Sequence, residues 1–91
     1  MTTRKPFKRP SAFVVRYGHK HGTDLWLCSS DDKAWKSIGG IISTWVEDEI
    51  QDAALRKKIR RALKANRIFA ASELWFTATE EWFSVESHVI Q

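Results

Sequence analysis

The chain has 91 residues, of which 43% are hydrophobic and 29% charged, and its formal net charge at pH 7 is +4. This length supplies one domain, and the composition is typical of a folded globular protein and not of a disordered segment. The single cysteine, Cys28, excludes an intramolecular disulfide and a multi-cysteine zinc site. No apolar run approaches the roughly 18 residues of a membrane span, and the basic N-terminus is not followed by the apolar run of a signal peptide. We therefore expect a cytoplasmic protein without membrane contact.

The first ten residues, MTTRKPFKRP, differ in composition from the rest of the chain. They combine Arg4, Lys5, Lys8 and Arg9 with two prolines and show no apolar period. This pattern predicts a flexible basic arm over residues 1–10, followed by a single α+β domain over residues 11–91.

A period of two begins at Ser11, because Phe13, Val15 and Tyr17 fall on one face of an extended strand. After the polar segment 18–24, residues 25–28 resume an apolar run. The two runs predict an antiparallel hairpin whose loop is longer than a two-residue turn.

After the hairpin, the apolar residues recur at the spacing of a helix. Ser29 to Asp32 provide capping residues and first-turn acids, so we expect a helix to begin near Asp31. Acidic residues at 47–52 would oppose the dipole at the end of one helix, so a break is predicted there. A second helix is expected to end near Asn66. The apolar positions of the two helices recur at intervals of three and four residues: Trp35, Ile38, Ile41, Ile42, Trp45 and Val46 in the first, and Leu55, Ile59, Ala62 and Leu63 in the second.

The last third of the chain is rich in aromatic and β-branched residues. Residues 74–77 and 82–90 predict two strands, with a turn at 79–81, and residues 68–71 are ambiguous between helix and strand. The resulting fold is α+β, with a mostly antiparallel sheet from two hairpins and two helices packed on one face, in the approximate order ββααββ.

The most distinctive segment is 56–67, in which seven of the twelve residues are basic. On a helix its charges form two adjacent rows opposite the apolar stripe. Such a face is suited to a polyanion or to an acidic protein surface, although it is also compatible with a simply solvated helix. The candidate partner-binding residues here are Arg56, Lys57, Arg60, Arg61, Lys64 and Arg67.

Two aromatic doublets, Trp75-Phe76 and Trp82-Phe83, lie in the predicted strands of the last third. Because neighbouring residues of a strand point to opposite faces, one member of each doublet should face away from the helices. We therefore add Trp75 and Trp82 to the candidate partner-binding residues, with a homodimer as the rival to an external partner.

Catalytic and metal sites have weak support in the sequence. His19 and His21 could hold a metal only with further ligands, and Cys28 would need a base such as His88 to act as a nucleophile. No phosphate-binding loop or hydrolase motif is present. We predict no catalytic residues, no metal and no cofactor.

These features together predict a small non-enzymatic binding protein. We expect a regulator or inhibitor that docks on a larger protein or nucleoprotein complex, and its size is typical of anti-defence proteins of phages or mobile elements. The alternative is direct DNA or RNA binding by the basic helix and the N-terminal arm.

Overall fold

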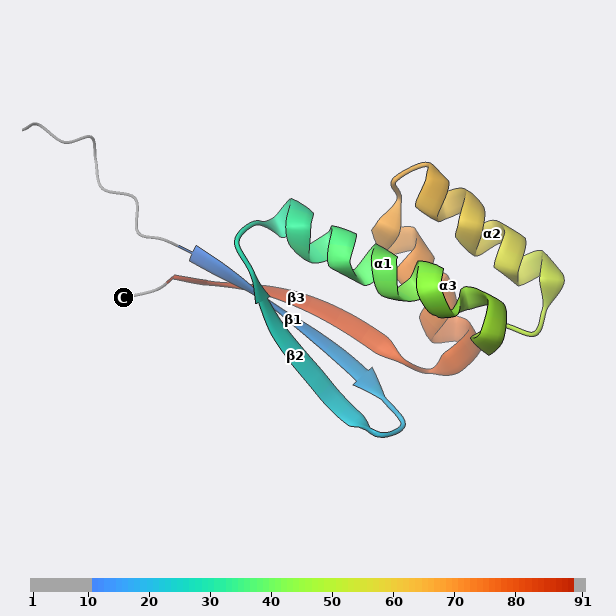
Figure 1. Cartoon of the computed structure of the whole chain (residues 1–91), viewed down its shortest axis with the longest axis horizontal. Helices are drawn as coiled ribbons and strands as arrows, with labels where there is room; N and C mark the ends of the chain where they lie inside the picture. The colour runs from blue at the N-terminus through green and yellow to red at the C-terminus, as the bar shows by residue number, and fades with distance from the viewer. Residues whose placement is uncertain (1–10, 90–91) are drawn as a thin grey trace, which may run out of the picture.

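The structure, a computed structural model, describes residues 11–89, so the predicted arm at 1–10 lies outside the described residues. The elements, in chain order, are β1 (Ser11–His19), β2 (Gly22–Cys28), α1 (Asp31–Glu49), α2 (Ala53–Lys64), α3 (Ile68–Thr79) and β3 (Trp82–Val89). The three strands form one antiparallel sheet in the order β2-β1-β3 (Figure 1). The α+β class is confirmed, whereas the predicted order ββααββ is wrong, because the order is ββαααβ.

The hairpin of β1 and β2 confirms the first predicted strand pair but not its loop. His19 pairs with Gly22, so only Lys20 and His21 form the turn, which is shorter than predicted. Gly22 has a φ of +129°, a backbone conformation that glycine adopts without the steric cost of a side chain. This glycine allows the chain to reverse within two residues.

The second predicted hairpin does not exist, because residues 74–77 belong to α3 and β3 pairs with β1 instead. The buried residues of α3 are Ala71, Ser72 and Trp75. Trp75 follows the other two by four and three residues, as one helix face requires, and α3 contacts both α1 and α2. Burial against these helices outweighs the β propensity of the aromatic residues, which is a weak and context-dependent preference. The ambiguous residues 68–71 form the first turn of α3.

The predicted helix ends of α1 and α2 are confirmed. Ser30 caps α1 by accepting a hydrogen bond from the backbone N–H of Lys33 at 3.1 Å, and α1 ends at Glu49, inside the predicted break. Asp52 caps α2 by accepting from Ala54 N at 2.9 Å. Asn66 stops α2 in the left-handed conformation, with a φ of 60°.

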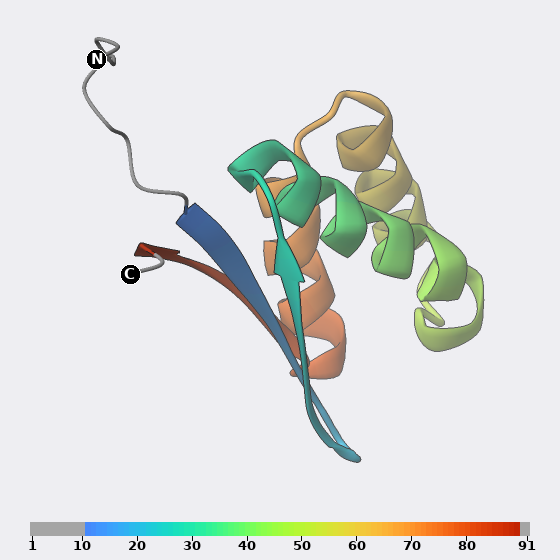
Figure 2. The ribbon, with the colours of Figure 1, turned by 60° about the vertical axis from the view of Figure 1, so that its left-hand side comes forward.

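The molecule has three layers instead of the predicted two. The helices α1 and α3 pack on one face of the sheet, and α2 packs on α1 and α3 without touching the sheet (Figure 2). Gly39 of α1 is buried where α1 meets α3, since a Cβ there would lie 3.2 Å from Ile68 Cδ1. The core lies between the layers and consists of Val15, Ala34, Ile38, Ile42, Val46, Ile50, Ile59, Ala71 and Trp75.

Candidate macromolecule-binding surface

The basic residues of α2 divide into two groups according to the side of the helix on which they lie. Arg56 is half-buried and donates hydrogen bonds to the carbonyl oxygens of Ile50, at 2.7 Å, and Gln51, at 3.3 Å. Arg60 forms a salt bridge with Glu47 near the end of α1. Both arginines therefore hold α2 against the end of α1, a role that sequence analysis did not predict.

The second group points away from the rest of the molecule. Ile59 is the buried residue of α2, and helical spacing places Lys57, Arg61 and Lys64 on the opposite side. All three are exposed and take part in no salt bridge within residues 11–89, as is also true of Lys58 on the flank. We call Lys57, Arg61 and Lys64 the outward basic row. Their charges are available to a partner because no carboxylate of the described chain neutralises them at contact distance.

Arg67 does not continue this row along α2. It follows the stop at Asn66 and occupies the N-cap position of α3 without a side-chain capping bond. It lines a pocket of about 310 Å³ together with Asp31 and Asp32 of the first turn of α1. Among the described residues it forms no salt bridge with either aspartate, and its position after the helix stop separates it from the charges of α2.

The two candidate tryptophans have different environments. Trp75 is fully buried in the core, so it is not accessible to a partner. Trp82 is 41% exposed on the sheet face that no helix covers, where its indole lies over Gly18, its partner on β1. Leu25 and Leu27 of β2 are exposed on the same face. The prediction that one aromatic of the doublet Trp82-Phe83 faces away from the helices is confirmed.

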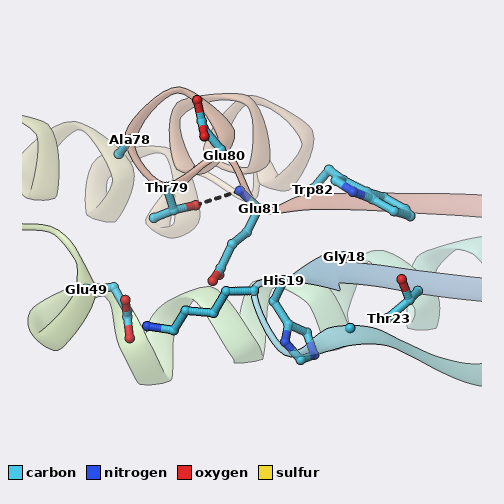
Figure 3. Close-up of a pocket in the computed structure, with 11 residues that line it drawn as sticks. Gly18, His19, Thr23, Glu49, Ala78, Thr79, Glu80, Glu81 and Trp82 are labelled. Carbon is cyan, nitrogen blue, oxygen red and sulfur yellow. Dashed lines mark hydrogen bonds between the residues drawn. The ribbon is translucent and has the colours of Figure 1, made fainter.

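A polar pocket of about 550 Å³ lies at the turn of the hairpin, between α1, α3 and β3 (Figure 3). Figure 3 shows the side chain of Glu81, the residue before β3, extending toward the hairpin, with Glu49 of α1 nearby. Glu81 Oε1 accepts hydrogen bonds from the Tyr17 hydroxyl at 2.6 Å and from Trp75 Nε1 at 3.3 Å. These bonds join β1, α3 and β3 at one carboxylate.

Burial raises the pKa of Tyr17 above its ordinary value, and its hydrogen bond to Glu81 and the charges of the neighbouring carboxylates raise it further. Tyr17 is therefore a neutral hydrogen-bond donor at physiological pH. We assign this group a structural role, since its bonds are all made within the protein. Sequence analysis missed it, because the contacts depend on where α3 ends.

The histidines and the cysteine are not arranged as the catalytic or metal alternatives would need. The backbone N–H of His21 donates to His19 Nδ1 at 3.2 Å, and His19 Nε2 lies 3.0 Å from an oxygen of Asp24, so both ring nitrogens of His19 are engaged. Within residues 11–89 no three His, Cys, Asp or Glu side chains form a group that could hold a metal. Cys28 packs against the core on the helix-facing side of the sheet, whereas the strand register places His88 on the other side. The structure does not bring them together.

Among the described residues, no helix combines the length and the apolar character needed to cross a bilayer. The comparisons with protein families, with curated proteins and with solved structures find no match to this chain.

Proposed function

We propose that this protein is a small non-enzymatic binding protein, a regulator or inhibitor, that docks on a larger protein or nucleoprotein complex through the outward basic row of α2. One observation carries the proposal. Arg56 and Arg60 are bonded to the end of α1, whereas Lys57, Arg61 and Lys64 are exposed and unpaired within the described residues. The burial of Ile59 sets which side of α2 faces the molecule, so the unpaired cations project from the opposite side.

Three features of the row favour an anionic surface as its target. Its residues rise along the helix by about 10 Å in total, which matches an extended acidic patch better than a single small anion. The row lies on α2, the layer farthest from the sheet, so a partner can approach it without displacing other elements. Arg61 can also bind a carboxylate or phosphate through two parallel hydrogen bonds.

The test is affinity capture from a cell lysate, with and without nuclease, using the wild-type protein and the double variant Lys57→Glu with Arg61→Glu. The matched control, Lys33→Glu with Lys36→Glu on α1, changes the net charge equally at two exposed positions away from α2. We expect the wild-type and control proteins to retain a partner that the α2 variant loses. Survival of the complex after nuclease supports a protein target, and equal capture by all three proteins would show that the row is only a solvated face.

Direct binding of DNA or RNA is the second candidate, favoured by the same unpaired cations. If four cations, Lys57, Lys58, Arg61 and Lys64, neutralise phosphates, counterion release predicts a slope of roughly −3 to −4 in a plot of log K against log salt for duplex DNA. The measurement is fluorescence anisotropy of a labelled mixed-sequence duplex and a labelled RNA. Absence of binding at low salt would exclude this candidate.

Three finer predictions belong to the same proposal. They are a cytoplasmic location, an origin in a phage or mobile element, and the ability to form a homodimer. Sedimentation over a concentration series tests the last of these directly.

A further inference from the structure

A groove of about 400 Å³ runs between α3 and the start of β3. No residue of α2 lines it, and it adjoins the polar pocket at Trp82, which lines both. Its walls are one side of α3 and the first two residues of β3. The residues of the helical wall recur at the three- and four-residue spacing of a single helix face: Phe69, Ser72, Glu73, Phe76 and Thr77.

The helical wall exposes large aromatic side chains. Phe69 is 61% exposed and Phe76 is 50% exposed. Phe69 is held in place by an edge-to-face contact with Trp35 of α1, with ring centroids 5.6 Å apart. Exposed aromatic rings around a groove usually mark a binding surface, because leaving them in water is unfavourable.

The opposite wall belongs to a strand with a free edge. β3 pairs with β1 on one side, and within residues 11–89 no strand pairs with its other side. Natural edge strands are commonly protected by lysine or proline, and β3 contains neither. Of the three strands, α3 contacts β3 alone, so the helix lies over this edge of the sheet. The backbone N–H and C=O groups of an edge strand are available to pair with an added strand.

We propose that this groove binds an extended segment of another protein, which adds a fourth strand to the sheet along the free edge of β3. Backbone pairing with β3 would supply affinity, and alternate side chains of the segment would contact the aromatic wall of α3. The preferred segment therefore has apolar residues at alternate positions. It also carries a lysine or arginine, because Glu73 is the one charged side chain that lines the groove.

Charge distinguishes this partner from a second copy of the chain. Two copies joined edge to edge through β3 would each carry a formal net charge of +4. Repulsion between these like charges opposes self-association, whereas a lysine or arginine of an extended segment is attracted to Glu73. This inference does not depend on the outward basic row of α2.

The experiment selects ligands for the wild-type protein from a phage-displayed library of short random peptides and measures the affinity of the most enriched peptide. We expect alternating apolar residues and at least one lysine or arginine in the enriched sequences. Phe76→Ala should weaken binding about tenfold, since an aromatic anchor is typical of a hot spot. Glu73→Lys should weaken it as well, whereas the matched surface variant Leu25→Ala and the α2 variant Lys57→Glu with Arg61→Glu should bind as the wild type does. Circular dichroism verifies that every variant is folded.

Strand addition makes a second, more specific prediction about the peptide backbone. Methylation of alternate peptide nitrogens should abolish binding in the register whose N–H groups face β3 and be tolerated in the other register. Hydrogen exchange of β3 amides should slow in the complex. The proposal is overturned if the wild-type protein enriches no peptide beyond those enriched in a parallel selection against the Phe76→Ala variant. It is also overturned if the peptide binds when methylated in either register, or if the bound peptide maps to α2 or to the uncovered face of the sheet. A dimer that Phe76→Ala dissociates would identify a second copy as the occupant instead.

Discussion

The two aromatic doublets have the same composition and lie in different secondary structures. Trp75-Phe76 belongs to α3, and Trp82-Phe83 begins β3. In the helix the tryptophan is buried and the phenylalanine is half exposed, whereas in the strand the tryptophan is exposed and the phenylalanine packs against the core. Neighbouring side chains point about 180° apart on a strand, which sends one ring inward and the other outward. On a helix they point only about 100° apart, so neighbours such as Ala71 and Ser72 can both be buried. The division into an inward and an outward ring is therefore required by the geometry of β3, whereas in α3 it depends on how the helix packs.

The inner members of the two doublets are connected to each other. Trp75 donates to Glu81, Glu81 accepts from Tyr17, and the ring of Tyr17 stacks on Phe83 with a centroid distance of 4.5 Å. Of the outer members, Phe76 belongs to the α3 wall of the groove, whereas the indole of Trp82 lies over Gly18 on the uncovered face of the sheet. We infer that the inner rings stabilise the junction of α3, β3 and β1, and that the outer rings are available for binding.

The largest expected effect is that of removing the inner tryptophan. Trp75→Ala should lower the free energy of unfolding by about 3–5 kcal/mol, because it leaves a large cavity in the core. Urea denaturation measures this loss, and Trp75→Phe, which keeps a ring but loses the hydrogen bond to Glu81, should lose less. Trp45→Ala is the matched control, since Trp45 is 48% exposed. Equal losses for Trp45→Ala and Trp75→Ala would contradict the distinction between inner and outer rings.

The contact between Trp82 and Gly18 gives the next largest effect. A Cβ on Gly18 would lie 2.1 Å from Trp82 Cε2, so Gly18→Ala must displace the indole from its position over β1. We expect a loss of about 1–3 kcal/mol, as for other steric insertions into a packed site. In a Trp82→Ala background the same change should be neutral or stabilising, because glycine is unfavourable in a strand. A double-mutant cycle measures the coupling, and additive effects would show that the contact is unimportant.

Much of the fold could be predicted from local signals. The alternation of Phe13, Val15 and Tyr17 predicted β1, and the serine and aspartate residues before α1 predicted its start. Asn66 likewise predicted the end of α2. Each of these signals acts within a few residues of the feature that it specifies, which is why a single sequence contains it.

The errors concern features that depend on distant contacts. The aromatic residues of α3 have high β propensity, and only their burial between other elements makes the helix the stable structure. The spacing of Ala71, Ser72 and Trp75 could have indicated this helix. For the candidate site, helical spacing predicted the outward row, but not the bonding of Arg56 and Arg60 to α1, because that depends on how the chain turns between the two helices.

The hydroxyl of Tyr17 should have a smaller effect that depends on pH. Its raised pKa means that the folded protein retains the proton at pH values where the unfolded chain loses it, so stability should fall as the pH rises above about 10. Tyr17→Phe should cost about 1 kcal/mol at neutral pH through the lost hydrogen bond and should flatten the alkaline decline. Tyr17 is the single tyrosine of the chain, so no other tyrosine contributes. Parallel stability curves for the two proteins between neutral and alkaline pH would show that Tyr17 is not the group responsible.

The smallest expected effect on stability is that of the outer phenylalanine. Phe76→Ala should change the free energy of unfolding by less than about 0.5 kcal/mol, as is usual for surface substitutions, because half of the ring is already in water and no core residue depends on it for packing. Phe83→Ala, the same substitution at the inner ring of the other doublet, should cost several times more, since it removes the ring that stacks on Tyr17. Urea denaturation of both variants makes the comparison. If Phe76→Ala proves as destabilising as Phe83→Ala, then Phe76 belongs to the core. A loss of peptide binding in that variant would then result from damage to the fold and would not show that the peptide binds in the groove. If it is nearly neutral, the exposed ring has no structural role that accounts for its position, and its effect on peptide binding reports directly on the groove.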